Sequence, residues 1–206
     1  QDAHAWWSNI KKTIIQSLNK AELDGKNIAA LSVSSQGIAF VPIDHEGNTL
    51  YNAISWLDGR SKEEAAAIRS QCESEKMFYR TGKNILPCYL LPQMMWMKAH
   101  RQEVYHKAHK MLMAHDYIIY KLTGRMATDL SMASGTLVYD IHEQRWMTEL
   151  LDQFELDASK LPELMVTGQI AGTVLPKVAK ELGLSEQTKV VIGAQDQRCA
   201  SIGAGI

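Results

Sequence analysis

The chain has 206 residues, of which 46% are hydrophobic, and this length and composition predict a globular domain with a substantial core. The net charge of −1 comes from interspersed acids and bases, which excludes the strongly basic surfaces that bind nucleic acid or anionic membranes. The three cysteines, Cys72, Cys88 and Cys199, are far apart in the sequence, so we expect a reducing compartment and no structural zinc. No apolar stretch has the length of a membrane span and the first residues lack a signal-peptide pattern. These features favour a cytoplasmic protein with a neutral small-molecule partner.

The amino-terminal part predicts a helix followed by three extended segments. Apolar residues recur at helical spacing over residues 3–22, and Ile28–Ser34 has the composition of a buried strand. Further extended segments are expected at Ile38–Ile43 and Ala53–Trp56. Between them, Gln36-Gly37 interrupts the pattern where no hairpin is required, which indicates either a simple bulge or the close approach of backbone or a small ligand.

The middle of the chain is mostly helical by its periodicity. A helix is expected over Lys62–Glu75, where Ser61 and Glu64 fit a capping box. The small polar segment Thr128–Thr136 is expected to be a loop or to line a site. The other expected elements are helices at Leu91–His100, Glu103–His109, Tyr117–Leu122, Met147–Phe154 and Pro176–Leu182, and extended segments at Lys110–Ala114 and Val138–Ile141.

A lone acid, Asp196, follows the strand-like run Val190–Ala194 and precedes a helix rich in small residues, Arg198–Gly205. The carboxyl end of a strand and the amino end of a helix meet where ligands of α/β sheets bind. Asp196 is therefore either the N-cap of the helix or a carboxylate that takes a proton from a substrate hydroxyl, with Gln197 beside it to bind other hydroxyls.

Two further clusters carry open alternatives. Trp56 could stack on a sugar while Asp58 and Arg60 bind hydroxyls, or the acid and base could simply pair with each other. His115-Asp116 could reach the same sheet edge, or Asp116 could be an N-cap. The histidines do not share one helix face with a carboxylate, so no metal site is predicted. No Walker or Gly-x-Gly-x-x-Gly loop occurs, so any nucleotide binding must come from elsewhere.

Motifs along the whole chain resemble, in order and spacing, the first domain of FGGY-family carbohydrate kinases, with the xylulose kinase and glycerol kinase branches nearest. The motifs are Ser34–Gly37, Tyr51–Ser61, Thr81-Gly82, Tyr89–Met97, Asp116-Tyr117, Leu122–Gly124, Thr128-Asp129, Ala133–Thr136, Trp146, Leu161-Pro162, Gly168, Gly172 and Gly193–Gln197. Each motif is weak alone, and only their order makes the resemblance specific.

The resemblance implies an α/β fold of the ribonuclease H-like type, a mixed sheet flanked by helices, as in the sugar kinase and actin superfamily. It also implies ATP-dependent phosphorylation of a ketose or polyol hydroxyl, with ATP and Mg²⁺ used by the full-length enzyme. Asp196 matches the family's catalytic base and Gln197 matches a substrate contact. The residues that fall on or beside segments lining the sugar pocket are Gln36, Gly37, Trp56, Asp58, Tyr89 and Asp116.

The sequence also departs from the family pattern. Gly37-Ile38 stands where xylulose kinases usually carry Met-His and glycerol kinases carry Arg-Glu, so neither substrate is assigned. Gln93–Trp96 replaces the usual Lys-x-x-Trp. The family's amino-terminal Asp-x-Gly-Thr phosphate element and its second, ATP-binding domain are absent from residues 1–206. We therefore expect a partial N-terminal sugar-binding domain, truncated at both ends, that is inactive by itself.

One alternative function and the oligomeric state remain open. A non-catalytic sugar-binding or regulatory relative would keep the fold without turnover, although the presence of Asp196 favours the kinase. The oligomeric state is open, and a homodimer is one option.

Overall fold

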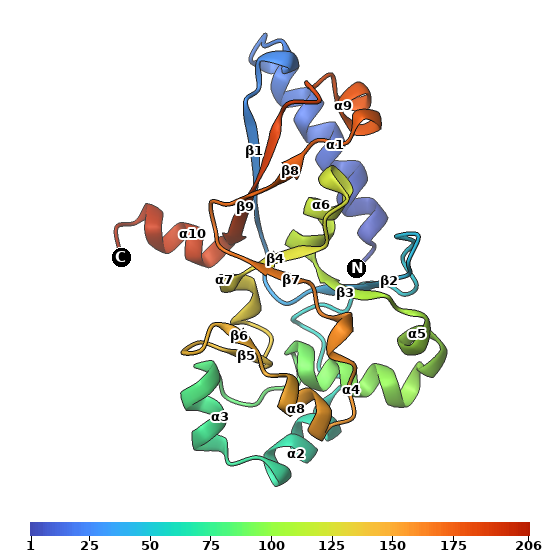
Figure 1. The fold of residues 1–206 in the computed structure, drawn as a ribbon, viewed down its shortest axis with the longest axis vertical. Helices are drawn as coiled ribbons and strands as arrows, with labels where there is room; N and C mark the ends of the chain where they lie inside the picture. Colours follow the sequence, from blue (N-terminus) through green and yellow to red (C-terminus); the bar gives the residue numbers. More distant parts are fainter.

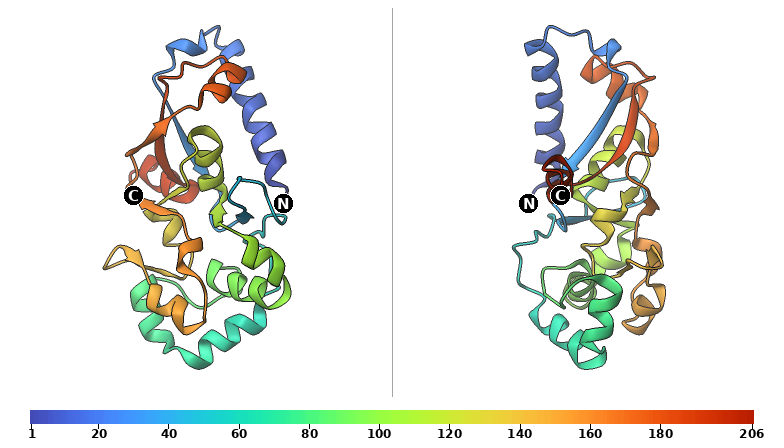
Figure 2. Two further views of the ribbon diagram at one scale, coloured as in Figure 1. Left: turned by 45° about the vertical axis from the view of Figure 1, so that its right-hand side comes forward. Right: turned by 90° about the vertical axis from the view of Figure 1, so that its left-hand side faces the viewer.

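The computed structural model describes residues 1–206, which pack around two separate hydrophobic cores (Figure 1). One core, of 19 buried residues, lies in the part built on the main β-sheet, which we call the sheet half. The other, of 22 buried residues, lies among short helices in what we call the helical half. Figure 2 shows the two halves stacked along the long axis of the molecule.

The sheet half is built on three strands in the order β1-β9-β8, which are β1 (Ala30–Ser35), β9 (Lys189–Gln195) and β8 (Ile170–Thr173). β1 runs parallel to β9 and β8 runs antiparallel to it, so the sheet is mixed. The central strand β9 is largely buried, as its apolar run predicts. The prediction of a buried strand before Ser35 is wrong in one respect: β1 lies at the sheet edge and alternates between exposed and half-buried residues.

The two parallel strands approach unusually closely at Gly193. A Cβ atom at this position would collide with the carbonyl oxygen of Val33, and the register of β1 against β9 shifts between Ser32 and Ser34. A glycine is needed there because only a residue without a side chain admits the neighbouring backbone. This irregularity lies just before the carboxyl ends of both strands.

Three helices complete the sheet half: α1 (Ala3–Lys20), α6 (Ala114–Thr123) and α9 (Pro176–Leu182). α6 packs on the sheet, and α1 packs against both α6 and α9 (Figure 1). The predicted first helix is confirmed, and its start is fixed by Asp2, whose Oδ1 accepts a hydrogen bond of 2.8 Å from the His4 N–H.

A two-stranded antiparallel ribbon, β2 (Phe40–Ile43) with β3 (Lys110–Met113), separates the two cores. Phe40 on β2 belongs to the core of the helical half, whereas its neighbour Val41 belongs to the core of the sheet half. Successive side chains of a strand point to opposite faces, so one ribbon contributes to both cores. The expected third strand at Ala53–Trp56 is reduced to a single bridge from Ile54 to Phe40.

The helical half contains five helices and a small hairpin. These elements are α2 (Lys62–Gln71), α3 (Ser74–Thr81), α4 (Leu90–His100), α5 (Gln102–Lys107), α8 (Thr148–Gln153), β5 (Tyr139–Asp140) and β6 (Arg145–Trp146). The single helix predicted over Lys62–Glu75 is wrong, because Cys72 is extended and ends α2. The break turns α3 so that Met77 reaches the same core as Ile68. The capping box is also wrong, since the buried Ser61 hydroxyl makes no hydrogen bond.

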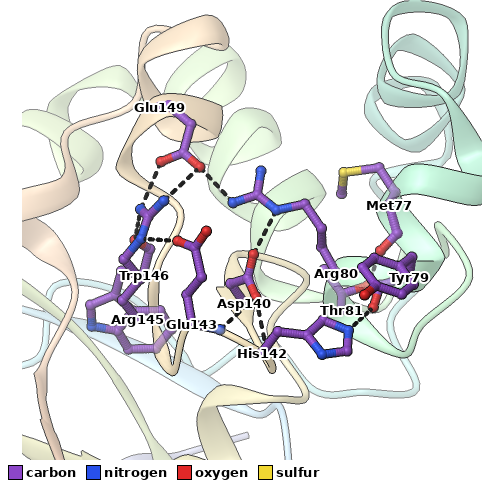
Figure 3. A network of polar contacts seen from close by, with 10 residues as sticks. All are labelled: Met77, Tyr79, Arg80, Thr81, Asp140, His142, Glu143, Arg145, Trp146 and Glu149. Atoms are coloured by element: carbon purple, nitrogen blue, oxygen red, sulfur yellow. Dashed lines mark hydrogen bonds and ion pairs between the residues drawn. The ribbon is translucent and has the colours of Figure 1, made fainter.

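An ion-pair network holds α3, the β5-β6 hairpin and α8 together (Figure 3). Arg80 on α3 contacts Asp140 at 2.6 Å and Glu149 at 2.6 Å, and Arg145 bonds to Glu149 at 2.9 Å. Burial would raise the pKa of Asp140, but hydrogen bonds from the Glu143 N–H and from Arg80 outweigh it and lower the pKa to about 2. The network thus joins short elements that bury little apolar surface between them.

The segment expected to be a loop over Thr128–Thr136 is instead a strand and a helix, β4 (Ala127–Asp129) and α7 (Leu130–Ala133). Asp129 causes the change, because its carboxylate accepts hydrogen bonds from the N–H groups of Ser131 and Met132 and caps α7. β4 pairs in parallel with β7 (Glu163–Met165). Two 3-10 turns, at Gly25–Asn27 and Ala158–Lys160, complete the chain before its last helix, α10 (Asp196–Gly203).

The predicted α/β class, a mixed sheet flanked by helices, is confirmed. None of the helices combines the length and apolar character that crossing a bilayer requires.

Candidate functional site

A cavity of about 300 Å³ lies where the carboxyl ends of β1 and β9 meet the helical half. Ten residues line it: Gln36, Gly37, Ile38, Trp56, Lys83, Cys88, Tyr89, Gln195, Asp196 and Gln197. The first three follow β1, the last three are the final residue of β9 and the two that follow it, and the other four come from loops of the helical half. The structure thus brings together six of the predicted site residues: Gln36, Gly37, Trp56, Tyr89, Asp196 and Gln197.

The segment after β1 forms a tight turn rather than a simple bulge. Ile38 has a φ of 63°, and the Ala39 N–H donates to the Gly37 carbonyl oxygen at 3.0 Å, which closes a γ-turn around Ile38. A β-branched residue in the left-handed region is strained, so the surrounding packing must hold it in place. Ile38 lies so near Gly135 that a Cβ there would meet its Cγ1 at 3.1 Å. The turn is therefore a fixed part of the cavity wall.

Asp196 is the first residue of α10, and the capping position belongs to Gln195. The simpler alternative, that Asp196 is the N-cap, is therefore wrong. Asp196 is exposed at the cavity, and its Oδ1 accepts a hydrogen bond of 2.7 Å from the Gln197 N–H. An acidic side chain in the first turn is also favoured by the helix dipole. This arrangement leaves the second carboxylate oxygen available to a ligand hydroxyl.

The opposite wall is aromatic and uncharged apart from Lys83. The Trp56 side chain is 49% exposed, which leaves ring surface available to a ligand. Burial and the neighbouring Cys88 raise the pKa of Tyr89, and burial raises the pKa of the Cys88 thiol, so both groups are neutral near pH 7. An aromatic face opposite carboxamides and a carboxylate suits a polyhydroxylated molecule, which offers both C–H surface and hydroxyls.

Asp58 lies beside this cavity rather than in it. It lines a neighbouring hollow and pairs with Arg60 at 2.6 Å. The hydrogen bond from Arg60 lowers the pKa of Asp58, although its partial burial opposes this. The Arg60 guanidinium also lies 4.6 Å from the Trp96 ring centre. Of the two alternatives for Asp58, the structure shows the local ion pair.

Asp116 is fully buried inside the sheet half and does not reach the cavity. Its Oδ2 accepts a hydrogen bond of 2.9 Å from the Met113 N–H at the start of α6, and its Oδ1 lies 3.1 Å from His115 Nδ1. Burial raises the pKa of Asp116, and the contact with His115 opposes the rise. The capping alternative for Asp116 therefore describes the fold better than a ligand contact, although Asp116 is a first-turn residue and not the N-cap itself.

Four residues that line the cavity were not predicted from the sequence: Ile38, Lys83, Cys88 and Gln195. Gln195 directly precedes Asp196, so its place at the end of β9 was a usable signal. Lys83 and Cys88 lie in a loop of the helical half, and nothing in their local sequence indicates that this loop faces the sheet. No three His, Cys, Asp or Glu side chains lie close enough together to form a cluster of metal ligands.

Comparison with known proteins identifies the fold and the family. The chain is 32% identical over its whole length to the xylulose kinase of Staphylococcus xylosus, of which it covers 42%. Its structure resembles the xylulose kinase of Rhodospirillum rubrum with a TM-score of 0.94, 25% identity and 42% of that chain covered. It also resembles the gluconate kinase of Lactobacillus acidophilus with a TM-score of 0.91, 28% identity and 41% of that chain covered. The chain thus spans about two fifths of the length of these relatives.

A model of the FGGY family of carbohydrate kinases, N-terminal domain, matches residues 1–203. Because this match spans nearly the whole chain and agrees with the fold, the chain belongs to the FGGY family of carbohydrate kinases.

Proposed function

We propose that this chain is the sugar-binding domain of an enzyme that phosphorylates a hydroxyl of a ketose or polyol with ATP. The single observation that supports this most strongly is the exposed Asp196 carboxylate at a cavity whose other walls are carboxamides and aromatic rings. The relatives' names as xylulose and gluconate kinases support a sugar or a related polyol as the substrate class.

In this proposal Asp196 is the general base. The sugar lies against Trp56 and Tyr89, and one hydroxyl donates a hydrogen bond to the free carboxylate oxygen of Asp196. As that hydroxyl oxygen attacks the terminal phosphorus of ATP, Asp196 accepts its proton and ADP leaves. Gln197 and Gln36 orient the remaining hydroxyls, since carboxamides both donate and accept hydrogen bonds.

ATP and Mg²⁺ would be held largely by parts of the full-length protein outside residues 1–206. The described residues contain no group of three or more His, Cys, Asp or Glu side chains that could hold a metal ion. We accordingly expect residues 1–206 alone to show no ATP-dependent turnover, and measurable turnover by this piece would contradict that expectation.

The decisive experiment replaces Asp196 by Asn in the full-length protein and screens ketopentoses, ketohexoses and polyols with ATP. We expect kcat to fall by about 10²- to 10⁴-fold while sugar binding, measured by calorimetry, is retained. Asp152→Asn is the matched control, because Asp152 is exposed on α8 and does not line the cavity. Unchanged turnover in Asp196→Asn would refute the general-base assignment, and sugar binding without any turnover by the unaltered protein would favour a non-catalytic relative.

A further inference from the structure

The side chain of Gln195 lies directly over the backbone of Gly37, on the wall of the cavity. A Cβ atom on residue 37 would lie 2.5 Å from Gln195 Nε2 and 3.0 Å from its Cδ. The first distance is shorter than real Cβ contacts, and the second is tighter than most of them. The carboxamide of Gln195 thus occupies the space that a side chain at position 37 would need.

The contact with Gln195, and not the backbone conformation of Gly37, is what opposes a side chain at position 37. The φ of Gly37 lies outside the left-handed region, unlike that of the next residue, Ile38. The φ of residue 37 therefore does not call for a glycine. The obstacle to a side chain is the far end of the flexible Gln195 side chain, which could swing away at small cost to the fold.

Gln195 is held in place through its backbone and not through its carboxamide. Its N–H donates to Ser131 Oγ at 3.0 Å, and β9 pairs with β1 so that Gln195 lies opposite Ser35. The carboxamide does not cap α10. It is half-buried at the cavity wall, where its polar atoms can bind a ligand.

We propose that Gln195 is a specificity-determining residue that replaces a side chain at position 37 and hydrogen-bonds one hydroxyl of the sugar. This inference rests on the proposed function, because it places the sugar in the cavity beside Asp196. A carboxamide both donates and accepts, so it binds a neutral hydroxyl, and a substrate lacking that hydroxyl would leave it unpaired.

The first test is a double-mutant cycle in the full-length protein, with the sugar that gives the highest kcat/KM. Gln195→Ala removes the carboxamide, and Gly37→Ala displaces it from the cavity. We expect each substitution to raise KM by about tenfold with kcat nearly unchanged. The double variant should match either single variant, because both remove the same contact. Gln16→Ala, an exposed glutamine on α1, is the matched control and should leave KM unchanged.

The second test uses a series of deoxy analogues of the same sugar. For the unaltered protein, kcat/KM should fall for the analogue that lacks the hydroxyl bound by Gln195. Gln195→Ala should reduce this discrimination by about tenfold and leave the discrimination against analogues deoxygenated at other carbons unchanged. Melting temperatures of all variants separate a loss of binding from a loss of folding.

The outcomes also separate this inference from the proposed function. The inference is refuted if Gln195→Ala leaves KM unchanged, or if the effects of Gln195→Ala and Gly37→Ala on KM multiply in the double variant. In either case Asp196→Asn still tests the general base independently. If the unaltered protein neither binds nor phosphorylates any sugar of the panel, the proposed function fails, and this inference fails with it.

Discussion

The two halves of the molecule are stabilised in different ways, and the candidate site needs both of them. The sheet half packs strands and three helices around a core rich in Ile, Val, Leu and Ala. The helical half packs its helices around a core rich in methionine and leucine and adds the Arg80 ion-pair network (Figure 3). The sheet half supplies the Asp196 carboxylate at the cavity, and the helical half supplies the aromatic side chains. The cavity is thus lined on one side by residues at the carboxyl ends of β1 and β9, and on the other by loops of the helical half.

The largest expected effect is a loss of folding free energy caused by substitutions in the β2-β3 ribbon between the halves. Phe40→Ala leaves a void in the core of the helical half and should cost about 3–5 kcal/mol of folding free energy. Val41→Ala, on the next residue, opens the core of the sheet half and should cost less, because fewer atoms are removed. Denaturant unfolding gives the two costs, and amide hydrogen exchange shows which half loosens. If both variants loosen the same half, the division into two cores is wrong.

A buried sheet-half residue should behave differently from a cavity residue. Asp116→Ala removes the acceptor for the Met113 N–H inside the core and should cost about 1–3 kcal/mol. Its KM for sugar should stay near that of the unaltered protein, because Asp116 does not line the cavity. Thermal unfolding and kinetics on the same sample check both expectations. A large rise in KM with an unchanged melting temperature would return Asp116 to the binding residues.

The ion-pair network should make the helical half sensitive to acid. Asp140 has a folded pKa of about 2, below its ordinary value of 3.8, so its stabilising effect is complete above pH 3.8 and is lost as the pH falls towards 2. The loss should be on the order of 1–2 kcal/mol. Asp140→Asn should flatten this part of the stability profile, measured by denaturant unfolding between pH 5 and 2, whereas Asp152→Asn should not. A profile unchanged by Asp140→Asn would show that the network adds no pH-dependent stability.

The smallest expected effect is a loss of sugar affinity when an aromatic side chain of the cavity is removed. Trp56→Ala removes an exposed ring from the cavity and should weaken sugar binding by about 1 kcal/mol, which is roughly fivefold in KM, with little change in stability. Trp96→Ala is the comparison, because Trp96 lies under Arg60 within the helical half and should affect stability more than KM. Equal KM values for Trp56→Ala and the unaltered protein would remove Trp56 from the pocket.

Periodicity and short-range signals in the sequence determined most elements of the fold. The first helix, the Met-rich helix α4, the helix over Pro176–Leu182 and the buried strand β9 were all predicted within a few residues. These features depend on the helical spacing or the unbroken run of apolar residues within one element, which is visible locally. The break between α2 and α3 was missed, because it depends on how both helices reach one core.

The sequence also determined that Asp196 stands between a strand and a helix, and the order of its motifs indicated the family. Only the tertiary structure decided which polar residues share the cavity. It placed Asp116 in the core and Asp58 beside Arg60, and it brought Gln195 over Gly37. The register of β1 against β9 sets that last contact, because Ser35 pairs with Gln195. Such contacts join segments far apart in the chain, and strand register is fixed by the packing of the whole sheet and not by either segment alone.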